Sequence, residues 1–153
     1  MLGKKTVVKY NDGTIVKGFT SDFNPNRDSF HLHLVQESLQ EGQENPIEVK
    51  LNGIKAVFFV KDFQGNKEYQ KVRTFKDIAS GPPSERKIVV IFKDGENFYG
   101  TTHSFSPERK GFFVYPIDEH DNNDRVFVPR NALEKVHVKK FGSEDFDIFL
   151  YEN

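Results

Sequence analysis

Apolar and polar residues alternate along two stretches of the chain, one near the N-terminus and one past the middle. The apolar positions that carry the alternation are Val8, Tyr10, Ile15, Phe19, Val90, Phe92 and Phe98. A period of two places successive side chains on opposite faces of a strand. The pattern therefore predicts short β-strands in both stretches.

The two stretches are copies of each other. The 27 residues that begin at Val7 recur 82 positions later without a gap, and ten of the aligned pairs are identical. The later parts of the copies match at an offset of 79, so the loop between these parts is three residues shorter in the second copy. Such self-similarity indicates repeated folding units. We therefore expect two equivalent units.

Each copy carries the residues of a tight hairpin and of a bent sheet. Asp12-Gly13 and Asp94-Gly95 stand between apolar runs, and glycine tolerates the positive backbone angle that a tight hairpin turn requires. Gly18 and Gly100 fall inside the next strand, where a glycine usually marks a bulge or a bend at a barrel corner. A polar connection with a proline, residues 24–29 in the first copy, then leads to a third strand.

The second half of each copy has the pattern of a strand, a break and another strand. The break falls at Asn52 and at Asn131 and is too short for an α-helix. With the hairpin motif Val-x-Tyr/Phe-x-Asp-Gly-x₄-Gly at 8–18 and 90–100, the chain resembles the SH3-like and Sm-like barrel family. The resemblance implies a mainly β fold of two tandem five-stranded barrels related by internal duplication, with a short helical turn before the last strand of each.

The resemblance covers about residues 4–60 and 86–141, and such barrels specify no function. More narrowly, the run from Asp12 to His33 is similar to an uncharacterised bacterial tandem domain without an established activity.

The expected domain boundaries follow the repeat. The first barrel takes residues 1–62 and the second takes residues 86–141. Residues 63–85 form the connection, in which the Gly65-Asn66 pair favours a hairpin over one helical turn and Ser80–Ser84 is a Pro/Gly linker. Residues 142–153 combine four acids with aromatic residues, which indicates an arm docked as a strand.

Composition counts against several classes of function and site. The chain has 22 basic and 23 acidic side chains, a formal net charge of −1, and so no long-range field for a polyanion such as RNA. It has no cysteine, which rules out disulfides and thiolate metal sites. No stretch has the length of a membrane span and no apolar signal core opens the sequence, so we expect a cytoplasmic protein without membrane contact.

Catalytic and metal motifs are missing from the sequence. No nucleophile elbow, Gly-rich phosphate loop or acid–base pair at a meaningful spacing is present, so we expect no enzyme and no cofactor. His31 and His33 lie two apart and share one face of a strand, but the second copy has Phe113 and Tyr115 there, which favours two exposed histidines over a metal site. Residues 120–124 hold cation-ligand types at a spacing that departs from a calcium loop.

A repeated arginine is the main candidate for ligand binding. Arg27 and Arg109 each follow a proline by two residues and a phenylalanine, Phe23 or Phe105, by four. Such a turn presents a guanidinium beside a ring, which suits a phosphate, a carboxylate or a stacked base. The alternative, which we favour, is that the arginine caps its own loop and the phenylalanine is core. The candidate ligand-binding residues are Arg27, Arg109, Phe23, Phe105, His31 and Tyr115.

Three function classes follow. The preferred one is a non-catalytic binding or adaptor module that presents loops and a sheet edge to a protein partner, or to further copies in an oligomer. The second is a nucleotide or RNA reader, including a cyclic dinucleotide receptor similar to the PilZ family. Its family motif pairs Arg-x₃-Arg with Asp/Asn-x-Ser-x₂-Gly, whereas this chain has Arg125-x₄-Arg130 and no second element. The third class is an enzyme without a nameable nucleophile.

Overall fold

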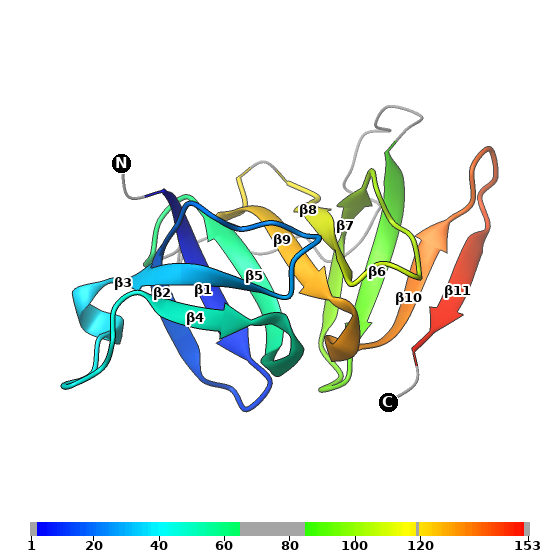
Figure 1. Ribbon diagram of the computed structural model, residues 1–153. Helices are drawn as coiled ribbons and strands as arrows, with labels where there is room; N and C mark the ends of the chain where they lie inside the picture. Colours follow the sequence, from blue (N-terminus) through cyan, green and yellow to red (C-terminus); the bar gives the residue numbers. More distant parts are fainter. Residues whose placement is uncertain (1–2, 65–84, 119, 152–153) are drawn as a thin grey trace.

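The computed structural model describes residues 3–64, 85–118 and 120–151, and in these residues the fold is built from strands and 3₁₀ turns. The first unit contains β1 (Lys4–Tyr10), β2 (Ile15–Thr20), β3 (Ser29–Leu34), β4 (Ile47–Lys50) and β5 (Ile54–Val60). The second contains β6 (Arg86–Phe92), β7 (Asn97–Thr102), β8 (Gly111–Pro116), β9 (Asn123–Pro129) and β10 (Leu133–Lys139), and β11 (Phe146–Leu150) follows (Figure 1). The 3₁₀ turns are η1 (Gln36–Ser38), η2 (Leu51–Gly53) and η4 (Arg130–Ala132).

The duplication read from the sequence is present in the strand pairing. Val8 pairs with Val57 between β1 and β5, and the equivalent residues Val90 and Val136 pair between β6 and β10. Each of these two strand pairs also has a register shift at the same place, next to Tyr10 and Leu133. Two segments that share pairing, register and bulge are the same folding unit, as the repeat predicts.

The predicted hairpin turns are confirmed. Gly13 and Gly95 have φ angles of +93° and +91°, in the left-handed region that glycine adopts without strain. In each turn the aspartate before the glycine accepts a bond from the backbone N–H two residues on, at 2.8 Å for Asp12 and 2.9 Å for Asp94. The one-turn break predicted before the last strand is also present, as η2 and η4.

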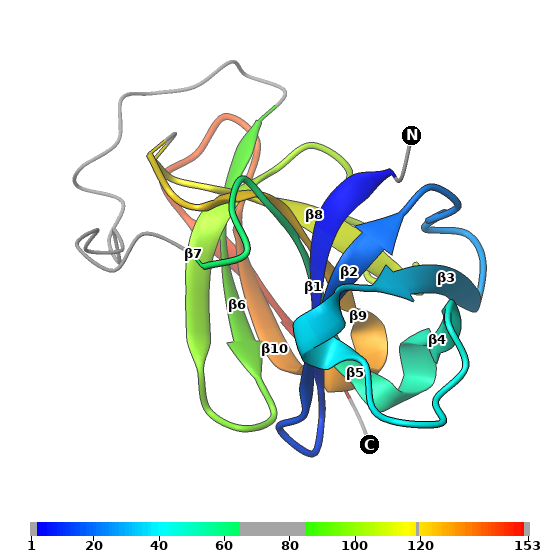
Figure 2. The same cartoon turned by 90° about the vertical axis from the view of Figure 1, so that its left-hand side faces the viewer.

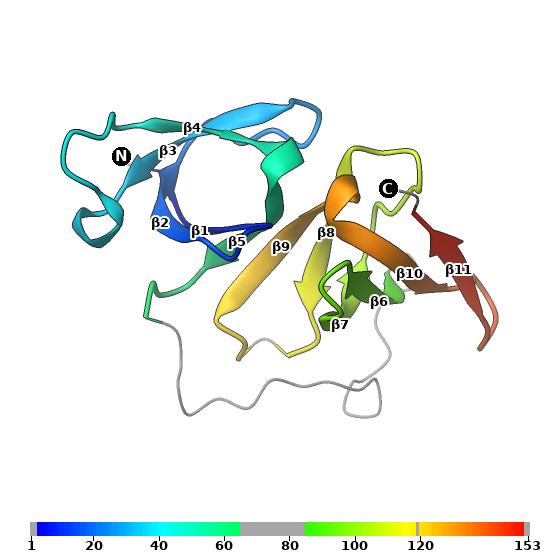
Figure 3. The ribbon, with the colours of Figure 1, turned by 90° about the horizontal axis from the view of Figure 1, so that it is seen from below.

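The expectation of two closed barrels is wrong. The eleven strands of the described residues form a single antiparallel sheet in the order β11-β10-β6-β7-β8-β9-β5-β1-β2-β3-β4. The first unit curls (Figure 3), but β5 pairs with β1 on one side and with β9 of the second unit on the other. A strand has only two edges, so β5 cannot also pair with β4 to close a barrel. In the second unit β11 takes the corresponding edge of β10.

The two units share their cores at the β5–β9 junction. Along β5, Val57 and Phe59 face the core of the first unit, whereas Ala56 and Phe58 face that of the second. From β9, Phe127 reaches into the core of the first unit and is fully buried there. Alternate side chains of one strand thus serve different cores. Figure 2 views the molecule from the side of the first unit, where β3 and β4 lie in front.

A buried lysine that pairs with two partly exposed acids joins the units beside this junction. Lys55 of β5 has a side chain only 5% exposed, and its Nζ lies 2.6 Å from Asp94 Oδ2 and 2.6 Å from Glu96 Oε1 in the β6–β7 turn. The same ammonium lies over the ring of Phe92, 4.6 Å from its centroid. The hairpin expected within 63–85, and the Pro/Gly linker after it, fall almost entirely in 65–84, outside the described residues.

Candidate functional site

A cleft of about 700 Å³ opens where the two units meet. Its walls come from the start of β3, the residues just before β3 and β8, the end of β4, the turns η2 and η4, and the residue that follows β11. The lining residues are Asp28, Ser29, Lys50, Leu51, Asn52, Lys110, Arg130, Asn131 and Tyr151.

Both copies contribute the same structural positions to the cleft. Asp28 and Lys110 are equivalent in the repeat, and so are Asn52 and Asn131. In each unit the first residue after the fourth strand donates its backbone N–H to the carbonyl oxygen of the loop residue before the third strand. The bond is 2.9 Å from Leu51 to Asp28 and 2.8 Å from Arg130 to Lys110. The bond fixes the 3₁₀ turn against the preceding loop. The duplication therefore gives each unit the same pair of loop and turn.

The cleft is positively charged overall. Lys50, Lys110 and Arg130 line it from three separate segments, and Asp28 is the one carboxylate in the lining. Lys110 Nζ lies 2.5 Å from Asp28 Oδ1, so this pair neutralises itself. Within the described residues Lys50 has no ion-pair partner. Lys50 and Arg130 are left to face an incoming ligand, and of these two Arg130 also interacts with the carboxylate of Glu108, which does not line the cleft.

Amide and phenol groups complete the site. Asn131 Nδ2 donates to the backbone oxygen of Asn52 at 2.6 Å, which joins the two turns across the cleft. Burial raises the pKa of the Tyr151 hydroxyl to about 12, and the nearby Arg130 charge opposes this shift without cancelling it. The phenol is therefore a neutral donor at physiological pH. The Arg130 guanidinium carbon lies 5.7 Å from the centroid of the Tyr151 ring.

This arrangement suits the binding of an anion. Ammonium, guanidinium and phenol groups donate to carboxylate or phosphate oxygens, and a concave site between units limits their contact with water. The lining contains no histidine, and its one hydroxyl of the serine type, Ser29 Oγ, donates to Glu48 Oε2 at 3.2 Å.

The two loop arginines lie next to the cleft but do not line it. Arg27 and Arg109 are exposed and sit in equivalent turns, in which the backbone N–H of each donates to the carbonyl oxygen three residues earlier. The residues that reach the cleft are their immediate neighbours, Asp28 and Lys110. Within the described residues neither guanidinium bonds a backbone carbonyl of its loop.

The candidate aromatic residues are packed against other rings. Phe23 contacts Phe30, Phe59, Phe113 and Phe127 at centroid distances between 5.0 and 6.0 Å. Phe105 lies 5.0 Å from Phe112 and 5.2 Å from Phe149. Tyr115 packs against His103 at 5.0 Å. None of these residues lines the cleft, so the structure separates them from the site that it forms.

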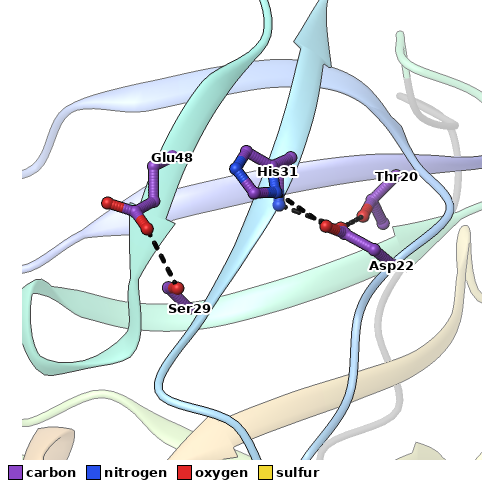
Figure 4. Close-up of polar contacts among 5 residues, drawn as sticks. All are labelled: Thr20, Asp22, Ser29, His31 and Glu48. Carbon is purple, nitrogen blue, oxygen red and sulfur yellow. Dashed lines mark hydrogen bonds and ion pairs between the residues drawn. The ribbon is translucent and has the colours of Figure 1, made fainter.

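His31 belongs to a polar cluster on the face of β3 and β4 that points away from the core (Figure 4). Its Nδ1 lies 2.7 Å from Asp22 Oδ2, and its backbone N–H donates to Asp22 Oδ1 at 2.9 Å. Partial burial works against ionisation, but these bonds and one from the Thr20 hydroxyl hold the pKa of Asp22 below its ordinary value. A carboxylate that orients a histidine is one part of a catalytic triad. The nearby hydroxyl, Ser29, is bonded to Glu48 instead.

Two further searches of the described residues bear on function. No three His, Cys, Asp or Glu side chains gather there closely enough to hold a metal ion. Among the same residues there is also no helix with the length and apolarity needed to cross a membrane.

A family model described as a family of unknown function (DUF6982) matches residues 2–140. The chain belongs to this family. The DUF6982 match spans both units and stops before β11. No curated protein and no solved structure matches the chain.

Sequence reasoning missed most of the cleft. Arg130 stood out in the sequence only as the second arginine of the partial PilZ-like motif, and the first, Arg125, stacks on Phe59 and Phe113 instead. Lys50 lies in a segment that carries no motif, and Lys110 directly follows the candidate Arg109 without having been singled out. The one usable signal was the repeat, because the cleft takes equivalent positions from both copies.

Proposed function

We propose that this DUF6982 protein is a non-catalytic binding module that holds an acidic segment of a partner protein in the cleft between its two units. The observation that carries the proposal is the convergence of three basic side chains from three segments on a cleft with a single carboxylate. Because charges of one sign in a concave site attract the opposite charge, the preferred ligand is anionic.

Two features favour a protein segment over a nucleic acid. The whole chain has a formal net charge of −1, so attraction is restricted to the cleft and does not extend along a polyanion. In addition, Ile148 and Leu150 expose 59% and 75% of their surface on the strand that leads to Tyr151. Exposed apolar residues beside a charged pocket are typical of a protein interface.

A second candidate is nucleotide binding of the PilZ-like kind. It is favoured by the exposure of Arg27 and Arg109, which leaves both guanidinium groups accessible to a phosphate. It requires the two arginines to engage one ligand although neither of them lines the cleft.

The test is isothermal titration calorimetry with a hexaglutamate peptide. We expect binding that weakens with salt and becomes about tenfold weaker in Lys50→Gln and in Arg130→Gln, since one charged hydrogen bond contributes about 1.5 kcal/mol. Lys4→Gln is the matched control, because Lys4 is an exposed lysine that does not line the cleft.

Every other outcome counts against the cleft as the binding site of an acidic segment. Absence of binding, or equal affinity in all three variants, would overturn the proposal. Binding of a cyclic dinucleotide that is lost in Arg27→Ala and Arg109→Ala, but not in Arg130→Gln, would replace it with the second candidate.

A further inference from the structure

The C-terminal strand β11 occupies on β10 the place that β9 occupies on β5. Val57 of β5 pairs with Phe127 of β9, and the equivalent residue of β10, Val136, pairs with Phe149 of β11. The next pairs also correspond, since Phe58 opposite Val126 is matched by His137 opposite Ile148. The arm therefore reproduces the register of a strand that belongs to a complete unit.

The aromatic anchor is reproduced as well. Phe127 packs against Phe23 at a centroid distance of 5.0 Å, and Phe149 packs against Phe105, the equivalent of Phe23, at 5.2 Å. Phe127 is a buried member of the first unit's core, and Phe149 is partly buried and packs against the core of the second. Phe149 thus fills on the second unit the space that Phe127 fills on the first.

At the other end of the sheet, β4 is the equivalent of β9, and its outer edge is unpaired in the described part of the chain. Glu48 stands where β9 has Phe127, and His31, its cross-strand neighbour, stands where β8 has Phe113. The pair is aromatic in the second unit, with Phe127 fully buried and Phe113 partly buried, whereas His31 and Glu48 are polar and exposed in the first (Figure 4). Pro46 limits this edge, since proline offers no amide to a neighbouring strand.

We propose that β11 is a terminating strand, which fills the β10 edge and so prevents a second copy of this chain from adding its β4 edge there. The β5–β9 junction is a head-to-tail contact between two like units, and such a contact repeats from copy to copy, in a ring or a filament, only while both of its ends are open. β11 closes one end by occupation. Glu48 closes the β4 end. In a contact between β10 and the β4 of a second copy, its carboxylate would have to take the place that Phe127 takes in the aromatic core at the β5–β9 junction. The proposal does not depend on what the cleft binds.

The experiment opens the two ends separately and together in the full-length chain. Glu48→Phe restores the aromatic anchor on β4. Asp147→Pro removes an amide that faces β10. The amide of Tyr151 faces β10, since it donates to Glu134 O, and amide directions alternate along an antiparallel strand, so the amide of Asp147, four residues earlier, faces β10 as well. Ile148→Pro is the matched control, since the same alternation directs its amide away from β10. Light scattering across a concentration series measures the molar mass.

We expect the mass of one chain for the wild type, for each single variant and for Glu48→Phe with Ile148→Pro. Glu48→Phe with Asp147→Pro should at least double in weight-average mass as concentration rises. A monomer in this last case, or association of Glu48→Phe alone, would overturn the proposal. Unfolding of Asp147→Pro, seen by circular dichroism, would overturn it too, because a terminating strand must be separable from the core of both units.

Discussion

Gly18 lies where two neighbouring strands approach so closely that a side chain has no space. A Cβ placed there would stand 2.3 Å from the carbonyl oxygen of His33 and 2.9 Å from Leu32 Cγ. Gly100 is in the same situation, 2.3 Å from the carbonyl oxygen of Tyr115. The two positions are equivalent in the repeat, so the same close approach of the second and third strands is built twice.

We therefore expect Gly18→Ala to lower the free energy of unfolding by about 3 kcal/mol, the upper range for overpacking, since backbone rather than a flexible side chain meets the new methyl group. Urea denaturation measures the free energy of unfolding of each variant. Gly53→Ala is the control, because no atom lies within 4 Å of its added Cβ, and it should change stability little. Equal stability of the two variants would show that β2 and β3 separate without cost.

The sequence predicted the place of this glycine but not its reason. A glycine inside a strand pattern indicates a bulge or a close approach, and the repeat located it in both copies. The atom that it meets belongs to His33, fifteen residues later. Only the register of Gly18 with Leu34 and of Phe19 with His33 brings that atom near. Register across a loop that contains a proline and no tight turn cannot be read from alternation alone.

At the scale of elements, the β6–β7 hairpin is tied to β5 through Lys55. The two acids of the turn are about half exposed, whereas the ammonium between them is buried. Removing the acids leaves a buried charge without a partner, while removing the lysine leaves two carboxylates that water can solvate. We expect Asp94→Asn with Glu96→Gln to cost about 2 kcal/mol, a value reduced for solvent screening of the exposed partners. Lys55→Met should cost less than about 1 kcal/mol. Equal losses in thermal or urea unfolding would contradict this asymmetry.

The same pair gives a pH dependence of stability. The hydrogen bond from Lys55 lowers the pKa of Asp94 below 3.8, so its contribution is complete above that value and is lost as the pH falls through the lowered pKa. The two acids overcome the effect of burial and raise the pKa of Lys55 above 10.5, so that contribution is complete below 10.5 and is lost at higher pH. The stability difference between the wild type and Asp94→Asn with Glu96→Gln should therefore be constant near neutral pH and shrink in acid. Urea titrations at several pH values measure it.

Elements were more predictable than their assembly. The Asp-Gly turns and the break at Asn52 specify local geometry, because few residues tolerate those backbone angles. Barrel closure was wrong, because it depends on which strand takes the second edge of β5. A signal was present, since Ala56–Val60 and Val126–Val128 are apolar without alternation. Such runs are typical of strands buried on both faces, as β5 and β9 are.

At the scale of the whole molecule, the cleft exists because one sheet continues through both units. Lys50 and Arg130 are 80 positions apart in the sequence and come together only when β5 pairs with β9. Had the two barrels been closed and separate, no residue pattern would have placed η2 beside η4. The repeat predicted equivalent turns, and the junction determines that the turns face each other across a shared site.

The same junction makes the units one cooperative structure. Phe127 is fully buried in the core of the first unit but belongs to a strand of the second. We expect Phe127→Ala to lower the free energy of unfolding by about 3–4 kcal/mol through the cavity it leaves. Because β9 carries Val126 and Val128 into the other core, the loss should reach both units equally.

Hydrogen exchange under native conditions tells whether the two units unfold together or independently. Each amide of a central strand reports the free energy of the opening that exposes it. In Phe127→Ala, amides of β1 and of β6 should lose the same protection. Leu150→Ala is the control: its side chain is 75% exposed, so the amides of both strands should keep the protection of the parent. If β1 loses protection while β6 keeps it, the units unfold independently. In that case the cleft, which needs both units folded, would open whenever the first unit unfolds, and its ligand would stabilise that unit alone.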